Sequence, residues 1–287
     1  MRIAVTGATG FVGRALCARL GAEHELRALV RAPDTTLRCE QRVIGDLARF
    51  REWRAALDGM QAVVHLAGYA HGHGDAASLH AVNIDATLAA AQAARSAGAH
   101  FIFASTIKVH GDESRSPLKE TSPLAPRDPY ARSKAQAEEA LRSLPGLRLT
   151  VLRAPLVYGP GVKANFLALM RAVDRGWPLP LASVGNRRSL IYVGNLADAI
   201  IRCLGHEGTY LVSDGGPIST TQLCRELAAA LGRPARLFPC PPSFLPRKLA
   251  ASLEVDDSAI RGSLGWQPPH SREAGLRATA EWYLAGR

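Results

Sequence analysis

The feature that most constrains this chain is a run of three glycines directly after its first apolar segment. Gly7, Gly10 and Gly13 follow the short apolar run 2–6 and open the periodic apolar run 11–20. A strand, a glycine loop and a helix in this order place backbone N–H groups where a pyrophosphate can bind. The spacing differs from the G-x-G-x-x-G of many dinucleotide-binding dehydrogenases. The N-terminus is therefore predicted to form a nucleotide-binding strand–loop–helix unit.

Strand and helix patterns alternate regularly through roughly the first 155 residues. Strands are expected at 25–30, 41–44, 62–66, 100–104 and 147–153, and helices at 77–97 and from Tyr130 to about 144. Such alternation with right-handed crossovers gives an α/β fold with a doubly wound parallel sheet.

Beyond residue 155 prolines interrupt the pattern, and helices are expected at 165–175, 195–204, 220–231 and 272–284. This division predicts a nucleotide-binding domain at 1–155 and a smaller α+β lobe at 156–287. Segments of the second part can return to the sheet.

Composition excludes several function classes. The chain has 287 residues, 47% hydrophobic and 21% charged, and no run of about 18 apolar residues. Its five cysteines are scattered, which fits reduced thiols and a cytoplasmic location. The net charge of +10 comes from dispersed arginines without a nucleic-acid motif. We therefore expect no nucleic-acid partner, no membrane partner and no metal, and favour a small phosphorylated ligand.

A tyrosine and a lysine four positions apart open the helix expected after residue 129. Tyr130 and Lys134 project from one helical face, about one turn from each other. A free phenol has a pKa of about 10, and a neighbouring ammonium lowers that pKa. The pair predicts an acid/base unit, although the same spacing is common on solvated helix surfaces.

The loops after the expected strands add candidates at the ligand-binding edge of the sheet. The strand 25–30 is followed by Arg31, where an NAD-binding chain would carry an acidic residue. Arg31 could pair with a 2′-phosphate, which makes NADP a candidate, or it could be a surface arginine. Asp46 and Gly68 follow the next two strands.

Seven short motifs occur in a characteristic order. They are Thr6–Gly13, Gly45-Asp46-Leu47, His65-Leu66-Ala67-Gly68, Val82-Asn83, Ala104-Ser105-Thr106, Tyr130-x-x-x-Lys134 and Leu152-Arg153-x-Pro155. In this order they resemble the extended short-chain dehydrogenases/reductases, in the NAD-dependent epimerase/dehydratase branch, and cover essentially the whole chain. Within that branch the chain is similar to bacterial UDP-sugar 4-ketoreductases and 4-epimerases of surface-polysaccharide pathways. The resemblance implies a Rossmann domain with a C-terminal substrate-binding lobe.

The resemblance also implies catalytic roles. Tyr130 would exchange a proton with the oxygen at C4 of a sugar, and Lys134 would lower the pKa of Tyr130 and bind the nicotinamide ribose. Thr106 would donate a hydrogen bond to the same oxygen, and Ser105 is the second candidate for that role. A turn at the strand end is the alternative interpretation of Ser105 and Thr106.

The residues implied to contact NAD or NADP lie in the loops named above. They are Gly7, Thr9, Gly10, Phe11, Val12, Gly13, Arg31, Asp46, Leu47, Leu66, Ala67, Gly68, Asn83, Tyr130, Lys134 and Pro155. Asp46 matches the adenine-binding acid of the family. An aspartate that forms a turn after Gly45 is the alternative.

For the substrate, Thr106 and Tyr130 would face the sugar, and Asn165 and Arg188 match positions that contact the diphosphate of a UDP-sugar. Asn165 could instead cap its own helix, and Arg188 could form a surface salt bridge. The second diphosphate-binding arginine of the family has no clear match, and Arg247 is the one guess.

Three positions depart from the family pattern. His110 stands where many relatives have tyrosine, Leu156 where many sugar epimerases have asparagine, and Ala86 where a glycine is common after Asn83. The sequence His71-Gly72-His73-Gly74 is expected to be a loop near the substrate mouth, because no partner carboxylate or cysteine pattern joins the two histidines.

The function predicted is reduction of a UDP-4-keto-6-deoxy-N-acetylhexosamine, which Arg31 favours if it binds NADP. The alternative is 4-epimerisation of UDP-glucose or UDP-N-acetylglucosamine, and a remote alternative is a catalytically silent NAD(P)-binding regulator. The presence of Thr106, Tyr130 and Lys134 argues against the silent regulator. A homodimer through the helices 77–97 and 130–144 is expected, and sedimentation would test it.

Overall fold

The computed structural model describes residues 1–21, 23–69 and 75–286. A parallel sheet of seven strands has the order β3-β2-β1-β4-β5-β6-β9. The strands are β1 Arg2–Thr6, β2 Glu25–Val30, β3 Glu40–Val43, β4 Ala62–His65, β5 His100–Thr106, β6 Leu149–Ala154 and β9 Gly208–Leu211. The strand order reverses between β1 and β4, where a doubly wound sheet binds its ligand. The predicted α/β Rossmann fold is confirmed.

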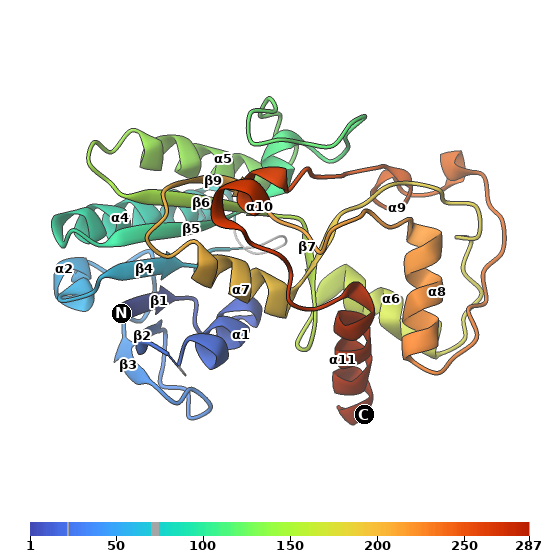
Figure 1. Cartoon of the computed structure of the whole chain (residues 1–287), viewed down its shortest axis with the longest axis horizontal. Helices are drawn as coiled ribbons and strands as arrows, with labels where there is room; N and C mark the ends of the chain where they lie inside the picture. The colour runs from blue at the N-terminus through green and yellow to red at the C-terminus, as the bar shows by residue number, and fades with distance from the viewer. Residues whose placement is uncertain (22, 70–74, 287) are drawn as a thin grey trace.

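Helices cover both faces of this sheet (Figure 1). One face carries α1 Phe11–Leu20, α7 Val193–Arg202 and α10 Ser258–Leu264, and the other carries α2 Trp53–Leu57, α4 Ala86–Ser96 and α5 Pro129–Arg142. The alternation of side chains along β1 explains the two layers. Ile3 and Val5 belong to the core under α1, and Ala4 belongs to the core under α4.

A smaller lobe lies at the carboxyl ends of the strands (Figure 1). Its two-stranded parallel sheet pairs β7 Leu156–Tyr158 with β8 Leu190–Tyr192. Around this sheet lie α6 Ala164–Asp174, α8 Thr220–Ala230, η3 Pro242–Phe244, α9 Arg247–Ala250 and α11 Arg272–Ala285. The chain leaves the large sheet after β6 and returns to it with α7 and β9. Both parts of the sequence therefore contribute to the Rossmann layers.

The helix expected at 77–97 consists of three segments. It begins with α3 Ala76–His80, continues through a π-helical turn, η1 Ala81–Asp85, and ends with α4. The π turn adds one residue per turn, and such turns occur frequently at functional sites. Asn83 lies in this turn with its side chain buried. No helix within the described residues is long and apolar enough to cross a membrane.

Candidate active site

The glycine loop after β1 fits a pyrophosphate. Gly7 has φ +69°, and a Cβ atom there would lie 2.8 Å from the backbone nitrogen of Ala67. A Cβ atom at Gly13 would lie 2.1 Å from the carbonyl oxygen of Gly7. Only glycines therefore allow the loop to pack against the end of β4 and against α1. Within the described residues, no side chain caps the first turn of α1, whose N–H groups suit an anion.

Two arginines lie near the segment that follows β2, Arg31 directly after the strand and Arg14 on α1. Arg31 is exposed, which fits both interpretations given above, a contact with a 2′-phosphate and a surface arginine. Arg14, which sequence analysis missed, donates from Nε to the carbonyl oxygen of Thr9 at 3.1 Å and lies 2.6 Å from Asp34. Hydrogen bonds from Thr36 and Arg14 lower the pKa of Asp34 to about 2. Arg14 and Asp34 are separated by 20 residues in the chain, so no local sequence pattern signals their contact.

Asp46 is exposed in the loop after β3. Its Oδ1 accepts a hydrogen bond from the backbone nitrogen of Ala48 at 3.0 Å. This is the turn geometry given above as the alternative interpretation, and it leaves the predicted adenine contact as a proposal.

Asn83 joins three elements of the site. Its amide group exchanges hydrogen bonds with the backbone of Tyr69, at 2.7 Å and 3.1 Å, and donates to Ser133 Oγ at 2.9 Å. Ser133 in turn donates to the carbonyl oxygen of Tyr130 at 2.8 Å. These contacts fix the loop after β4 against the first turn of α5. Asn83 therefore supports both segments, and its predicted contact with the cofactor stays a prediction.

The first turn of α5 presents Tyr130. Asp128 caps this helix by accepting a hydrogen bond from the backbone nitrogen of Ala131 at 2.7 Å, and Pro129 occupies the first helical position. The helix packs against β5 and η2 Ile107–His110. Tyr130 at its start and Thr106 at the end of β5 consequently lie at the same edge of the sheet.

Lys134 lies one turn further along α5 and is 5% exposed. Its Nζ is 3.8 Å from the ring centroid of Phe103 on β5, a cation–π contact. Burial lowers the pKa of Lys134 to about 7, and the carboxylate of Glu138 opposes this shift. The ammonium group therefore loses part of its charge near neutral pH.

The sequence predicts that Lys134 lowers the pKa of Tyr130, but in the structure this pKa is raised. Burial raises the pKa of Tyr130 to about 12, and the carboxylate of Asp128 contributes to the rise. The phenol therefore keeps its proton at neutral pH in the protein without ligand. The sequence argument failed here because it counted a neighbouring charge and could not count desolvation.

Thr106 and Ser105 have different surroundings. Thr106 ends β5 and its Oγ1 accepts a hydrogen bond from the backbone nitrogen of Lys108 at 3.3 Å. Ser105 donates from Oγ to Glu138 Oε1 at 2.5 Å, within the buried interior. This contact commits the Ser105 hydroxyl to Glu138, and we correct its role from second catalytic candidate to support of a buried carboxylate.

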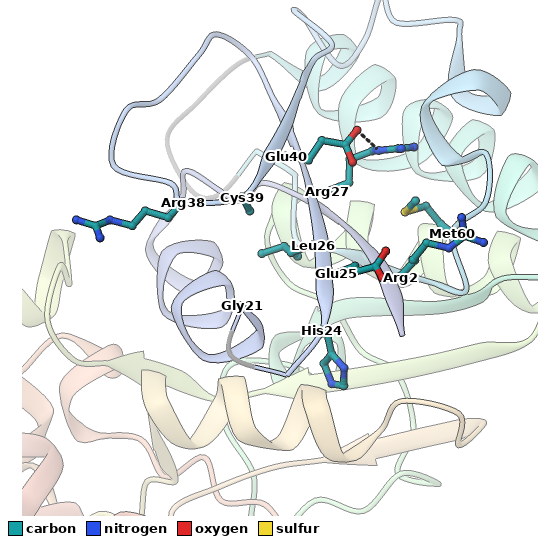
Figure 2. A pocket seen from close by; sticks show the side chains of 10 residues that line it. All are labelled: Arg2, Gly21, His24, Glu25, Leu26, Arg27, Arg38, Cys39, Glu40 and Met60. Carbon is teal, nitrogen blue, oxygen red and sulfur yellow. Dashed lines mark hydrogen bonds and ion pairs between the residues drawn. The ribbon is translucent and has the colours of Figure 1, made fainter.

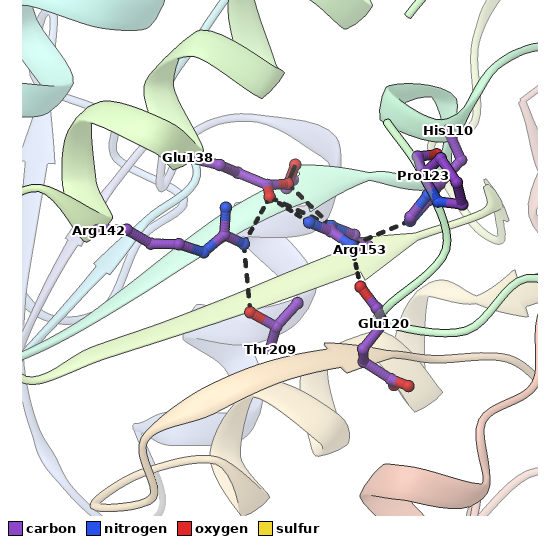
Figure 3. Close-up of polar contacts among 8 residues, drawn as sticks. His110, Glu120, Pro123, Glu138, Arg142, Arg153 and Thr209 are labelled. Carbon is purple, nitrogen blue, oxygen red and sulfur yellow. Dashed lines mark hydrogen bonds and ion pairs between the residues drawn. The ribbon is translucent and has the colours of Figure 1, made fainter. Parts of the chain in front are cut away.

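Glu138 and Arg153 form a buried ion pair beneath α5 (Figure 3). Arg153 Nη2 lies 2.6 Å from Glu138 Oε2, with side-chain exposures of 3% and 0%. Arg142 also donates to Glu138 at 2.8 Å, and hydrogen bonds from Arg153 and Ser105 hold the pKa of Glu138 below its usual range. The network anchors α5, and with it Tyr130, to β5 and β6.

His110, which replaces the tyrosine of many relatives, belongs to the same network (Figure 3). Its Nε2 lies 3.0 Å from Arg153 Nη1 and its Nδ1 3.1 Å from the carbonyl oxygen of Pro123. An arginine can only donate, so the histidine must accept at Nε2 and is neutral. Burial accordingly lowers the pKa of His110.

The proposed diphosphate residues lie on the lobe. Arg188 is half-buried and donates from Nη1 to the carbonyl oxygens of Lys248 and Ala251 at 3.0 Å and 3.1 Å. Burial lowers its pKa, and the nearby carboxylate of Asp112 opposes this. Arg247 instead pairs with Glu113 at 2.7 Å on the surface.

Asn165 does not cap α6. The helix begins at Ala164 with Lys163 at the cap position, and Asn165 is exposed in the first turn. Ala164 has φ 52°, a left-handed conformation that is strained for alanine. Strained backbone is concentrated at functional sites, and here it presents Asn165.

Two surface cavities lie away from these residues. One of about 460 Å³ opens at the amino ends of β1 and β2, among Arg2, Glu25 and Arg27 (Figure 2). Another of about 590 Å³ is lined by Asp198, Arg202 and Trp266. Parallel sheets bind ligands at the carboxyl ends of their strands, so the first cavity faces the wrong edge.

Residues 1–21, 23–69 and 75–286 contain no group of three or more histidine, cysteine, aspartate or glutamate side chains that could hold a metal ion. The predicted loop His71-Gly72-His73-Gly74 lies outside the described residues.

Comparison with known proteins places these features in context. The sequence profile of the NAD dependent epimerase/dehydratase family matches residues 3–212. A UDP-glucose 4-epimerase from Vibrio cholerae is 36% identical over 315 residues, which covers 98% of this chain and 95% of the relative. A GDP-6-deoxy-D-mannose reductase from Pseudomonas aeruginosa is 28% identical, in an alignment that covers 98% of this chain and 97% of the relative.

The fold is also similar to solved structures. A UDP-N-acetylglucosamine 4-epimerase from Methanobrevibacter ruminantium, in complex with UDP-N-acetylmuramic acid, superposes with a TM-score of 0.85 at 24% identity. The alignment covers 100% of this chain and 99% of that structure.

Proposed function

The chain belongs to the NAD dependent epimerase/dehydratase family, and we propose that it interconverts the C4 epimers of a UDP-sugar. Its relatives include nucleotide-sugar epimerases, dehydratases and reductases. The observation that carries the proposal is the position of Tyr130 and Lys134 on the first turns of α5, which packs against β5 with Lys134 Nζ over the ring of Phe103. Similarity to the Vibrio cholerae epimerase along nearly the whole chain supports the choice of reaction.

The cofactor of this family is NAD, and the residues present suit it. The first turn of α1 and the loop Gly7–Gly13 would hold its pyrophosphate. The end of β4, kept in place by Asn83, would border the nicotinamide side of the crevice. When bound, NAD accepts a hydride from C4 of the sugar and returns it.

Tyr130 would move the proton in this reaction. Its phenolic oxygen takes the proton of the sugar 4-hydroxyl as C4 is oxidised and gives it back when the 4-ketone is reduced. Thr106 Oγ1 donates a hydrogen bond to the same oxygen and stabilises the charge that develops there. To take this proton Tyr130 must be a phenolate, and burial and Asp128 both oppose its formation. In this proposal the charge of Lys134, one helical turn away, would favour the phenolate.

The lobe formed mainly by residues 156–287 would bind the nucleotide. Arg188 offers a guanidinium group suited to a diphosphate, and its Nη1 is positioned by two backbone carbonyls. Asn165 would add an amide donor from the first turn of α6. Arg247 is the weakest of the three because its pairing with Glu113 competes with a ligand.

Reduction of a UDP-4-keto-6-deoxy-N-acetylhexosamine is the second candidate. Sequence analysis placed it first because Arg31 makes NADP a candidate. The raised pKa of Tyr130 keeps the phenol protonated, which is the form that a ketone reductase needs before the reaction. The same residues would serve, but the cofactor would leave after every cycle. Epimerisation is preferred because of the Vibrio cholerae relative.

The test supplies purified protein with UDP-glucose or UDP-N-acetylglucosamine and no added cofactor. In parallel, the protein receives a UDP-4-keto-6-deoxy sugar with NADH or NADPH. We expect the C4 epimer to form in the first reaction. Loss of NAD(P)H absorbance with the ketone, without any epimer in the first reaction, would establish the reductase instead.

Tyr130→Phe tests the mechanism under either reaction. We expect a loss of about 100-fold or more in kcat, because removal of a general acid/base costs this much. Tyr210→Phe is the matched control, since Tyr210 lies on β9 with its hydroxyl donating to Glu207 at the amino end of the strand. Full activity of Tyr130→Phe would refute the mechanism.

A further inference from the structure

Three charged side chains connect the lobe side of the site with the start of α5. Lys108, on η2, pairs with Asp128 and lies 3.4 Å from Asp112 Oδ1. Asp112 is in turn an electrostatic neighbour of Arg188. The side chain of Lys108 is 20% exposed and that of Asp128 25%, so the pair is screened less than a surface pair. Catalysis as proposed above assigns no role to Lys108.

Asp128 contributes to the site in two opposing ways. Its Oδ1 caps α5 through the backbone nitrogen of Ala131, and this cap fixes the turn that presents Tyr130. Its negative charge, two residues before Tyr130 in the chain, also adds to the effect of burial in raising the pKa of Tyr130 and so disfavours the phenolate. A cation paired with Asp128 would leave the helix cap in place and would offset the effect of the carboxylate charge on the pKa of Tyr130.

We propose that Lys108 is a positioning residue of the reaction, which holds Asp128 in its capping geometry and neutralises the carboxylate charge beside Tyr130. Its second partner, Asp112, links this pair to the part of the site where Arg188 lies. The inference rests on the proposed function, since it requires Tyr130 to transfer the proton. It goes beyond that function because Lys108 touches neither the sugar nor the cofactor in this role.

Other charged groups surround α5 and could affect Tyr130. Lys134 follows on the same helix, with Glu138 behind it. The packed elements α3 and η1 contribute Asp75, His80 and Asp85, of which His80 and Asp85 pair at 3.2 Å. Asp128 is a charged group that raises the pKa of Tyr130, after burial as the larger cause. Removal of the cation that pairs with Asp128 should therefore raise the pKa of Tyr130 further.

The experiment is a double-mutant cycle on Lys108 and Asp128. Lys108→Met removes the charge from a side chain of similar length, and Lys108→Arg keeps the charge. Asp128→Asn removes the carboxylate charge but keeps a good helix cap. The pH dependence of kcat and KM is measured for C4 epimerisation of UDP-glucose, with a thermal melt of each variant.

In the wild type we expect kcat to rise with pH as Tyr130 ionises. In Lys108→Met this rise should occur at higher pH, with a loss of about three- to tenfold in kcat at neutral pH and little change in KM. Lys108→Arg should restore the profile. The double variant Lys108→Met, Asp128→Asn should return toward the wild-type profile, because the uncompensated charge is then absent. Lys119→Met is the control, since Lys119 is exposed and lies 3.8 Å from Asp256.

An unshifted profile in Lys108→Met, or a double variant no closer to wild type than Lys108→Met, would overturn the inference. A second readout separates this failure from that of the proposed function. NMR of ¹³C-labelled tyrosine, assigned with Tyr130→Phe, follows the ionisation of Tyr130 without any substrate. If the Tyr130 phenol ionises at higher pH in Lys108→Met than in the wild type, and the double variant reverses this shift, the result supports the inference even if no UDP-sugar is turned over.

Discussion

At the scale of single residues, neighbours in the sequence have different tasks. Ser105 and Thr106 are consecutive on β5, yet Ser105 donates to the buried Glu138 while Thr106 ends the strand near the helix that presents Tyr130. Sequence comparison placed both in one motif. The side-chain contacts divide them into a supporting residue and a candidate catalytic residue.

Alanine substitutions should separate these two tasks. Thr106→Ala should lower kcat by about 10²–10³, because a donor to the developing oxyanion is lost, and leave stability nearly unchanged. Ser105→Ala should leave kcat nearly unchanged and lower the free energy of unfolding by about 1–3 kcal/mol, because Glu138 loses a buried donor. Steady-state kinetics and chemical denaturation measure both effects. The opposite pattern would restore Ser105 as the catalytic candidate.

At the scale of elements, the start of each helix decides which residues it presents. Helix α5 starts at Pro129 because Asp128 caps it, and this start sets the position of Tyr130. The π turn η1 directs Asn83 into the interior, where a regular helix from 77 to 97 was expected. Helix α6 starts on the strained Ala164, which directs Asn165 outward.

Glycine substitutions should reveal the strain in α6. Ala164→Gly should raise the free energy of unfolding by up to about 1 kcal/mol, because glycine adopts φ 52° without a steric cost. Ala168→Gly, at an exposed position in the interior of the same helix, should lower it by about 0.5–1 kcal/mol. Denaturant unfolding compares the two variants. Equal losses at both positions would show that Ala164 carries no strain.

At the scale of the whole molecule, buried histidines join distant segments. His65 lies 3.1 Å from Thr6 Oγ1 and 3.0 Å from Thr87 Oγ1, which connects β4 with β1 and α4. His100 accepts a hydrogen bond at Nδ1 from the backbone nitrogen of Gly205 at 3.1 Å. Burial lowers the pKa of His65 to about 3 and that of His100 to about 4.

These histidines should make the fold sensitive to acid. Their folded pKa values lie below the unfolded value of about 6.5, so the unfolded chain binds protons first as the pH falls. The contribution of these histidines to the free energy of unfolding is complete above about pH 6.5 and is lost progressively towards pH 4 and below. Each histidine should lower the free energy of unfolding by about 2 kcal/mol at pH 5, since one pKa unit corresponds to about 1.4 kcal/mol.

Denaturant unfolding at pH 7.5 and at pH 5 measures this loss. His100→Gln provides the comparison, because it removes one titrating group and should reduce the difference between the two pH values, whatever its effect on absolute stability. Equal free energies of unfolding at both pH values in the wild type would contradict the prediction.

The sequence by itself determined the succession of strands along the first half of the chain, the glycine loop and the helix with Tyr130 and Lys134. These features depend on local patterns, such as apolar periodicity, glycine spacing and helix caps, which act within a few residues. The family followed from the order of such motifs. The homodimer and the division at residue 155 stay predictions.

Only the tertiary structure decided what the site residues touch and how they ionise. The return of β9 to the sheet, the commitment of Ser105 to Glu138 and the pairing of Lys108 with Asp128 join residues far apart in the chain. The raised pKa of Tyr130 depends on burial, which no local pattern reports. Desolvation and contacts between distant segments arise from packing, and packing is a property of the folded chain as a whole.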